Sequence, residues 1–222
     1  MKLKFRELSW AFLFKFKVIR LIIFYNLKRY SQKLKLLNNL NLNKNSIVLD
    51  IGSNNGMITQ YLYDKYSCSI FSFEPNPYCF LLQKDIFRRM SKIKIFNKAV
   101  SNDNKKKKLY LSKYTKNVEN MSTSESSSLE KAKSNISHDK FLYVKTISIK
   151  KLLSKFKYID LVKIDIEGHE YKILPEILRN INKIGKVFCE MHGKDHRKEF
   201  EKEFNFWEKK IRNLKERKFF YW

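Results

Sequence analysis

Hydrophobic and polar positions alternate in a regular way from residue 46 onward. Short runs of β-branched and aromatic residues, bounded by glycine or polar turns, are typical of buried strands, and the longer amphipathic stretches between them are typical of helices. Strands that alternate with helices form a parallel sheet covered by helices on both faces, which is a doubly wound α/β fold. The pattern predicts strands at 46–52, 69–76, 93–100, 158–168, 185–193 and 219–222, and helices at 57–66, 77–90, 170–181 and 196–218.

An N-terminal extension, residues 1–40, precedes this pattern and contains an apolar and aromatic run at 8–25. Lys15, Lys17 and Arg20 interrupt the run, which argues against a membrane-spanning helix, and no small-residue cleavage site of a signal peptide follows it. We therefore predict an imperfect, basic amphipathic helix. Two roles stay open for it: packing on the domain or over its cleft, and peripheral contact with an anionic membrane surface.

The predicted domain, residues 41–222, contains an insertion at 101–146. Two strand-like pieces, 107–114 and 140–146, flank the serine-rich stretch 120–135. A long stretch of this composition is either an exposed surface loop or a lid that contributes to binding. The sequence leaves both interpretations open.

Composition adds little about partners. The chain of 222 residues has a formal charge of +25, but lysine dominates this charge, and the abundance of Lys, Asn, Ile, Phe and Tyr with little Gly or Pro resembles a genome-wide bias. A polyanionic partner is therefore possible but not favoured. The three cysteines, which have no paired spacing, indicate neither a disulfide framework nor a zinc site, so a reducing, cytoplasmic location is expected: Cys68, Cys79 and Cys189.

Polar residues collect where the predicted strands end. In an open α/β sheet, ligands bind beyond the carboxyl ends of the strands, near the point where the strand order reverses. Chemistry is therefore expected among these side chains, which are Asp50, Glu74, Asn97, Asp165, Glu167, Glu190 and His192.

The first of these loops indicates an adenosine-containing ligand. Gly52 and Gly56 follow the first strand, but Asn54 stands where a dinucleotide fingerprint has its second glycine, which weakens a pyrophosphate interpretation. Glu74 follows Asp50 by 24 residues, at the end of the next predicted strand. A carboxylate at that point can accept hydrogen bonds from both hydroxyls of a ribose.

Five segments stand in the order seen in one enzyme family. "VLDIGSNNG", "FSFEPNP", "NKAVS", "SSSL" and "LVKIDIEGHEYKIL" together resemble FkbM-type methyltransferases, over residues 47–192. The resemblance implies the class I, Rossmann-like fold of S-adenosylmethionine-dependent methyltransferases and methyl transfer, usually to a hydroxyl of a sugar or polyketide. The basic N-terminal helix departs from the core pattern, and the terminal strand hairpin of the fold is expected to be shortened.

The resemblance also implies roles for individual residues. The cofactor's methionine portion would lie against the glycine turn with its ammonium near Asp50, Glu74 would bind the ribose, and the segment 97–100 would border the adenine. The expected cofactor-binding residues are Asp50, Gly52, Asn54, Gly56, Glu74, Asn97 and Ala99. The sulfonium carries its own positive charge, so no metal is expected, although Asp165 and Glu167 could be two ligands of Mg²⁺.

Methyl transfer to a hydroxyl requires a base that removes the proton as the bond forms. The candidates are Asp165, Glu167, His169, Glu190 and His192. Histidine suits this role because its ordinary pKa lies near neutrality, so His192 is the first choice and His169 the second. Alternatively, Asp165 and Glu167 orient the ligand or cap the following helix.

Two other functions compete with an O-methyltransferase that acts on a sugar or related metabolite. The basic charge would suit a nucleic-acid methyltransferase or binding protein, but "DIEG" stands where base-modifying enzymes of this fold commonly have an Asn/Asp-Pro-Pro-aromatic segment. A nicotinamide-dependent reductase shares the strand-glycine-helix start, but Asn54 and the acidic end of the fourth predicted strand count against it.

Overall fold

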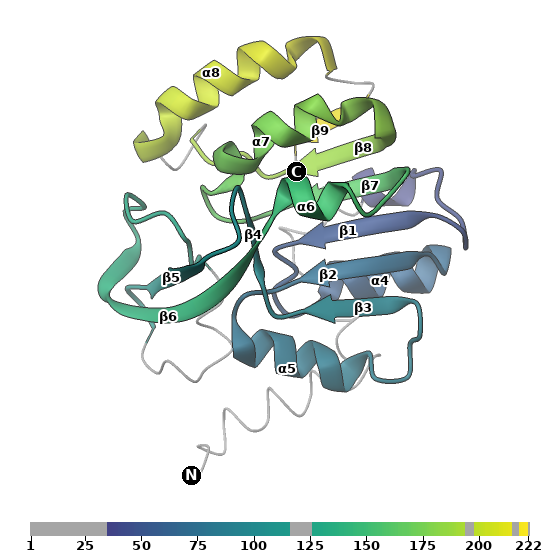
Figure 1. The fold of residues 1–222 in the computed structure, drawn as a ribbon, viewed down its shortest axis with the longest axis horizontal. Coiled ribbons are helices and arrows are strands. Elements are labelled where there is room, and N and C mark those ends of the chain that lie inside the picture. The colour runs from purple at the N-terminus through teal and green to yellow at the C-terminus, as the bar shows by residue number, and fades with distance from the viewer. Residues whose placement is uncertain (1–34, 116–125, 194–197, 215–217, 222) are drawn as a thin grey trace.

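A six-stranded sheet forms the centre of the computed structural model, which describes residues 35–115, 126–193, 198–214 and 218–221. Every neighbouring pair of strands in it is parallel. This confirms the predicted α/β class (Figure 1). In spatial order the strands are β3 (Ile93–Phe96), β2 (Ser69–Phe73), β1 (Ile47–Ile51), β7 (Ile159–Ile164), β8 (Ile184–Cys189) and β9 (Phe219–Tyr221).

The strand order reverses beside β1. The chain builds β2 and β3 on one side of β1 and later places β7, β8 and β9 on the other side. Loops that leave β1 and β7 therefore diverge and open a crevice at the carboxyl ends of these two strands. In Figure 1 the arrowheads of β1, β2, β3 and β8 point toward the side where β5 and β6 lie.

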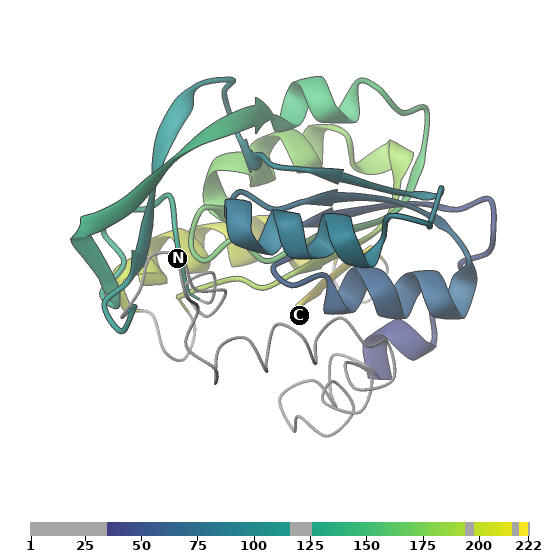
Figure 2. The ribbon, with the colours of Figure 1, turned by 90° about the horizontal axis from the view of Figure 1, so that it is seen from below.

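Helices cover both faces of the sheet, as a doubly wound fold requires. They are α4 (Met57–Tyr66), α5 (Pro77–Ile86), α6 (Ile149–Leu153), α7 (Glu170–Arg179) and α8 (Glu201–Ile211), with short 3-10 turns at Ile181–Lys183, Lys198–Phe200 and Arg212–Leu214. Figure 2 shows α6 and α7 on one side of the strands and α4 on the other. The period of two along a strand explains this: Leu49 and Ile51 enter the core under α6, α7 and α8, whereas Val48 enters the core under α4.

The N-terminal extension touches the domain at its described end. Residues 35–38 are helical, and both Leu37 and Leu40 are buried in the core that contains α4. The packed core therefore begins before residue 41. The amphipathic run at 8–25 and its predicted membrane contact lie outside the described residues. Within the described ranges, no helix combines the length and apolar character needed to cross a bilayer.

A second, three-stranded sheet stands at the carboxyl edge of the first. Its order is β4 (Ala99–Ser101), β6 (Ile136–Ser148) and β5 (Lys106–Ser112), with β5 and β6 antiparallel. The two strand-like pieces predicted within the insertion are thus confirmed, and their sheet extends beyond the predicted limits of 101 and 146.

The prediction of one strand over 93–100 is wrong, because the chain turns after β3 and β4 joins the small sheet. Asn97 fixes this turn by donating side-chain hydrogen bonds to the backbone oxygens of Glu74 at 3.0 Å and Pro75 at 2.9 Å. The predicted helix at 196–218 is also shorter than expected, since α8 ends at Ile211.

Candidate functional site

A cavity of about 290 Å³ lies at the carboxyl ends of β1, β2, β7 and β8. The loops that follow these strands form one wall, and residues of β4, β5 and the serine-rich segment form the other. This is where the topology of a parallel sheet predicts a ligand. The predicted site residues that line the cavity are Gly52, Asn54, Glu74, Ala99, Asp165, Glu167, His169 and Glu190.

Glu74 directly follows β2 and is only 3% exposed. Its Oε2 accepts a hydrogen bond from the backbone N–H of Asn54 at 2.7 Å, and its Oε1 accepts one from the N–H of Asn76 at 2.8 Å. These two bonds orient the carboxylate in the cavity lining, and a carboxylate accepts hydrogen bonds at about four lone-pair sites. The binding of a ribose by Glu74 stays a prediction, and the geometry is suited to it.

The glycines of the turn after β1 are required by neighbouring protein atoms. Gly52 has a φ of +78°, and a Cβ there would lie 1.9 Å from the backbone oxygen of Asp165. Gly56 begins α4 with the same φ, and a Cβ there would lie 2.8 Å from the ring of Phe87. A side chain at either position would displace the protein itself, so the packing of the protein already requires glycine here. The predicted contact of this turn with the methionine portion of a cofactor stays a prediction.

A buried ion pair lies beneath this turn. Lys163 of β7 is paired in register with Asp50 of β1, and its Nζ lies 3.2 Å from Asp50 Oδ1 and donates to the backbone oxygen of Gly52 at 2.7 Å. Asp50 is fully buried, and its Oδ2 accepts a hydrogen bond from Thr59 at 2.7 Å. Burial disfavours the charged form of Lys163, but the carboxylates of Asp50 and Asp165 outweigh it and raise the lysine pKa.

Asp50 therefore has a protein ammonium as its partner, in the layer behind the cavity lining. Sequence reasoning assigned it to a ligand's ammonium and missed Lys163. The sequence did contain a sign of this ion pair, because Asp50 and Lys163 are opposite charges within runs predicted to be buried strands. Gly56 is buried and Asn97 is exposed, and neither lines the described cavity; Asn97 holds the loop that carries Glu74.

The loop after β7 carries two acidic side chains. Asp165 has a side chain that is 24% exposed, with Oδ2 3.9 Å from Lys163 Nζ. Glu167 has a φ of +57°, a left-handed conformation that is rare for a residue with a side chain. Such strain costs about 1–3 kcal/mol and is characteristic of functional sites when the surroundings enforce it.

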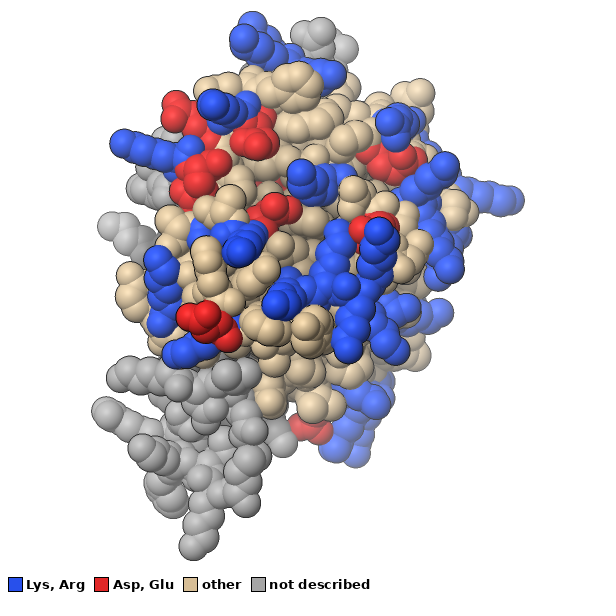
Figure 3. Space-filling view, turned by 60° about the vertical axis from the view of Figure 1, so that its left-hand side comes forward, with Lys and Arg blue, Asp and Glu red and all other residues tan. Residues whose placement is uncertain are grey.

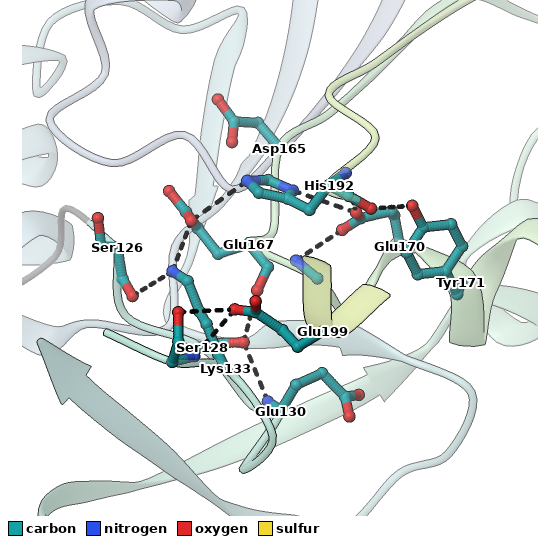
Figure 4. Close-up of polar contacts among 12 residues, drawn as sticks. Ser126, Ser128, Glu130, Lys133, Asp165, Glu167, Glu170, Tyr171, His192 and Glu199 are labelled. Atoms are coloured by element: carbon teal, nitrogen blue, oxygen red, sulfur yellow. Dashed lines mark hydrogen bonds and ion pairs between the residues drawn. The ribbon is translucent and has the colours of Figure 1, made fainter. Parts of the chain in front are cut away.

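Two cations contact the Glu167 carboxylate, and Figure 4 shows them on either side of it. Lys133 Nζ from the serine-rich segment lies 2.6 Å from Oε2, and His192 Nε2 lies 3.3 Å from the same oxygen. Burial opposes ionisation, but these two partners hold the pKa of Glu167 far below its usual range. Sequence reasoning missed Lys133, because one lysine in a lysine-rich chain gives no signal.

His192 is enclosed by carboxylates. Its Nδ1 lies 3.1 Å from Glu170 Oε1, its backbone N–H donates to the same oxygen at 2.8 Å, and Tyr171 donates its hydroxyl proton to the His192 backbone oxygen. Burial lowers the pKa of a histidine, but the hydrogen bonds to Glu167 and Glu170 overcome this and raise the His192 pKa to about 10. Its contacts with two carboxylates favour the imidazolium form of His192, and the residue lies behind the cavity lining. Both observations argue against its predicted role as general base.

His169 lines the cavity, but both of its ring nitrogens have protein partners. Nδ1 lies 2.6 Å from Glu130 Oε1, and Nε2 lies 2.9 Å from Ser101 Oγ. The ring therefore joins the insertion, the end of β4 and the start of α7. A histidine held in this way is suited to fixing the loop, and its role as a base stays a prediction.

The charges of the lining suit a cationic ligand. Among the described residues of the lining, Glu74, Asp165, Glu167 and Glu190 contribute four carboxylates, and Lys163 contributes one ammonium group. No cluster of three His, Cys, Asp or Glu side chains suited to a metal ion occurs in the described part of the chain. The Mg²⁺ alternative is also disfavoured electrostatically, since Lys133 and His192 already contact the Glu167 carboxylate.

The raised pKa of His192 predicts how stability depends on pH. A histidine with an ordinary pKa of about 6.5 when unfolded and about 10 when folded stabilises the protein fully below pH 6.5. This contribution is lost as the pH rises toward 10. His192→Gln should therefore lower the free energy of unfolding at pH 6 and flatten its decline between pH 6.5 and 10, as measured by urea unfolding. His138→Gln, at an exposed histidine, is the control, and parallel curves for the His192→Gln and parent proteins would contradict the assignment.

Comparison with known proteins places the chain in a family. A family model described as the methyltransferase FkbM domain matches residues 50–219. A solved structure titled "METTL16 MTase domain (crystal form 2)" is similar, with a TM-score of 0.44 and 12% sequence identity. The similarity covers 85% of this chain and 58% of that one. No curated protein matched the sequence. Since the family model covers most of the chain, the protein belongs to the FkbM methyltransferase domain family.

Proposed function

We propose that the protein transfers a methyl group from S-adenosylmethionine to a hydroxyl group of a sugar, a glycan or a related metabolite. The observation that carries the proposal is the Glu74 carboxylate, which two backbone N–H groups orient at the end of β2, in the lining of the cavity. In a member of a methyltransferase family, a carboxylate at this place is suited to the two ribose hydroxyls of the cofactor. Asn54 and Ala99 line the same cavity and would border the cofactor.

Charge complementarity supports the choice of cofactor. S-adenosylmethionine has a positive sulfur, a positive ammonium group and one carboxylate, so its net charge is positive. The described residues of the cavity lining present four carboxylates and one lysine. When bound, it supplies a methyl group that the sulfonium already activates, so the protein needs to orient the acceptor and remove its proton. Both tasks fall to side chains of the cavity.

Asp165 is our candidate for the residue that accepts the proton. It lines the cavity at the end of β7, and its side chain is 24% exposed. Glu167 is held as an anion by Lys133 and His192, so it is suited to orienting the acceptor hydroxyl and less suited to taking up a proton. His192 affects the reaction only through its contact with the Glu167 carboxylate.

The distribution of charge favours a glycan or metabolite over a nucleic acid. Lysines gather on the side of the molecule that carries β5 and β6 (Figure 3), where Lys106 and Lys108 also lie over the rings of Tyr143 and Phe141. The cavity itself is acidic. A nucleic acid carries a phosphate on every nucleotide and would bring these phosphates against the carboxylates of the mouth, whereas a sugar can enter without a charge.

Binding of S-adenosylhomocysteine tests the cofactor assignment. Each charge-assisted hydrogen bond contributes about 1.5–3 kcal/mol, so Glu74→Ala should weaken binding at least about tenfold in titration calorimetry. Glu201→Ala, at an exposed position in the first turn of α8, should bind like the parent. Parent protein that binds NADPH or duplex RNA but not S-adenosylhomocysteine would overturn the proposed function.

Mass spectrometry of cell-surface glycans tests the acceptor. Cells that lack the gene should lose one methyl group from a glycan, and the parent gene should restore it. Asp165→Asn should not restore it although the purified variant still binds S-adenosylhomocysteine, because loss of a proton acceptor slows transfer by about a hundredfold or more. Asp139→Asn, at an exposed position of β6, is the control. Full restoration by Asp165→Asn would remove Asp165 from the reaction.

A further inference from the structure

One buried lysine of the insertion, Lys133, pairs with Glu167 of the cavity lining. The Lys133 side chain is 0% exposed, and its Nζ lies 2.6 Å from Glu167 Oε2 and donates to the backbone oxygen of Ser126 at 2.5 Å. Buried lysines are rare unless they are paired, because removing an ammonium group from water is costly. The Glu167 carboxylate therefore stabilises the buried ammonium group, and the ammonium group in turn stabilises the carboxylate in its ionised form.

The same segment also contacts the backbone of the acidic loop. Ser128 donates its hydroxyl proton to the backbone oxygen of Glu167 at 2.7 Å, and Glu130 pairs with His169 at 2.6 Å. These contacts, with Lys133, join residues 126–133 to three groups of the loop after β7. They explain how Glu167 is kept in a left-handed conformation that its side chain disfavours.

Positive and negative side chains alternate around Glu167. Lys133 and His192 flank Glu167, and Glu170 lies on the far side of His192 (Figure 4). Other charged or titratable groups around the same cavity are Glu74, Glu130, Lys163, Asp165, His169 and Glu190. Several of these are carboxylates, which favour protonation of a neighbouring carboxyl group, whereas the two cations beside Glu167 favour its ionised form.

We propose that Lys133 is a positioning residue, which keeps the Glu167 carboxylate ionised and directed along the cavity wall. The acceptor side of the site is then complete only when residues 126–133 of the insertion lie in place. The consequence for methyl transfer rests on the proposed function, but the effect on Glu167 does not. Between the two interpretations of the serine-rich stretch, this favours a segment that contributes to binding.

A purely structural role for Lys133 is the alternative. In that case the ammonium would only fix the loop through the Ser126 backbone oxygen, and the ionisation of Glu167 would depend on His192 alone. The two roles differ in what happens to the Glu167 carboxylate when the lysine charge is removed. This difference can be measured without an acceptor substrate.

Carbon-13 NMR of glutamate-labelled protein follows the carboxyl group directly, with the Glu167 signal assigned by its absence in Glu167→Gln. In the parent this signal should stay at its ionised position down to the pH of acid unfolding. In Lys133→Met the signal should titrate above the pH of acid unfolding, because one close positive charge usually lowers a carboxyl pKa by about 1–3 and the variant lacks this charge. Lys133→Arg should retain the parent behaviour, and Lys131→Met, at an exposed lysine of the same segment, should not change it.

An unchanged Glu167 signal in folded Lys133→Met would overturn the proposal. Lys133→Gln, which keeps a hydrogen-bond donor without the charge, is the second variant and should behave like Lys133→Met. If neither neutral variant folds, Lys133 is a structural residue and the proposal is wrong. Failure of the parent to bind S-adenosylhomocysteine would refute the proposed function and leave the titration result unaffected.

Discussion

The site depends on one buried ion pair between the two central strands. Lys163 of β7 and Asp50 of β1 are 3% and 0% exposed, and they join the two strands between which the strand order reverses and the loops diverge. Removing one member of a buried pair costs about 3–5 kcal/mol, since the other charge is left without a partner. The Lys163 ammonium also binds the backbone oxygen of Gly52, so the same contact sets the turn after β1. Thr59 of α4 donates a hydrogen bond to the Asp50 carboxylate and holds it in place.

The negative charge of the cavity comes from acidic residues that follow neighbouring strands of the sheet. Strand ends that meet at one edge bring Glu74, Asp165 and Glu190 together, and a surplus of negative charge is suited to a cationic cofactor. Glu167 differs from the other three, because Lys133 and His192 hold its carboxylate from two directions. The insertion therefore forms part of the wall of the site. Its serines line the cavity, and Lys133 pairs with Glu167 of the loop after β7.

The sequence predicted the sheet and the place of Glu74 at its carboxyl edge, because each depends on local pattern and on strand topology. It did not predict the contacts of Lys133 and His192 with Glu167, because those depend on which side chains meet in space. His192 was expected to be a base from its ordinary pKa, and two carboxylates from α7 and its preceding loop change that pKa. The break between β3 and β4 was missed because Asn97 ends the strand through side-chain bonds, within a run that otherwise has strand-like composition.

A crystal structure of the full chain with S-adenosylhomocysteine tests the central claim most directly. The account predicts that both ribose hydroxyls lie within hydrogen-bond distance of the Glu74 carboxylate, and that the sulfur faces Asp165 and Glu167. Residues 126–129 should cover the ligand, with Lys133 still paired to Glu167. A ligand bound elsewhere, or with its ribose away from Glu74, would contradict the account.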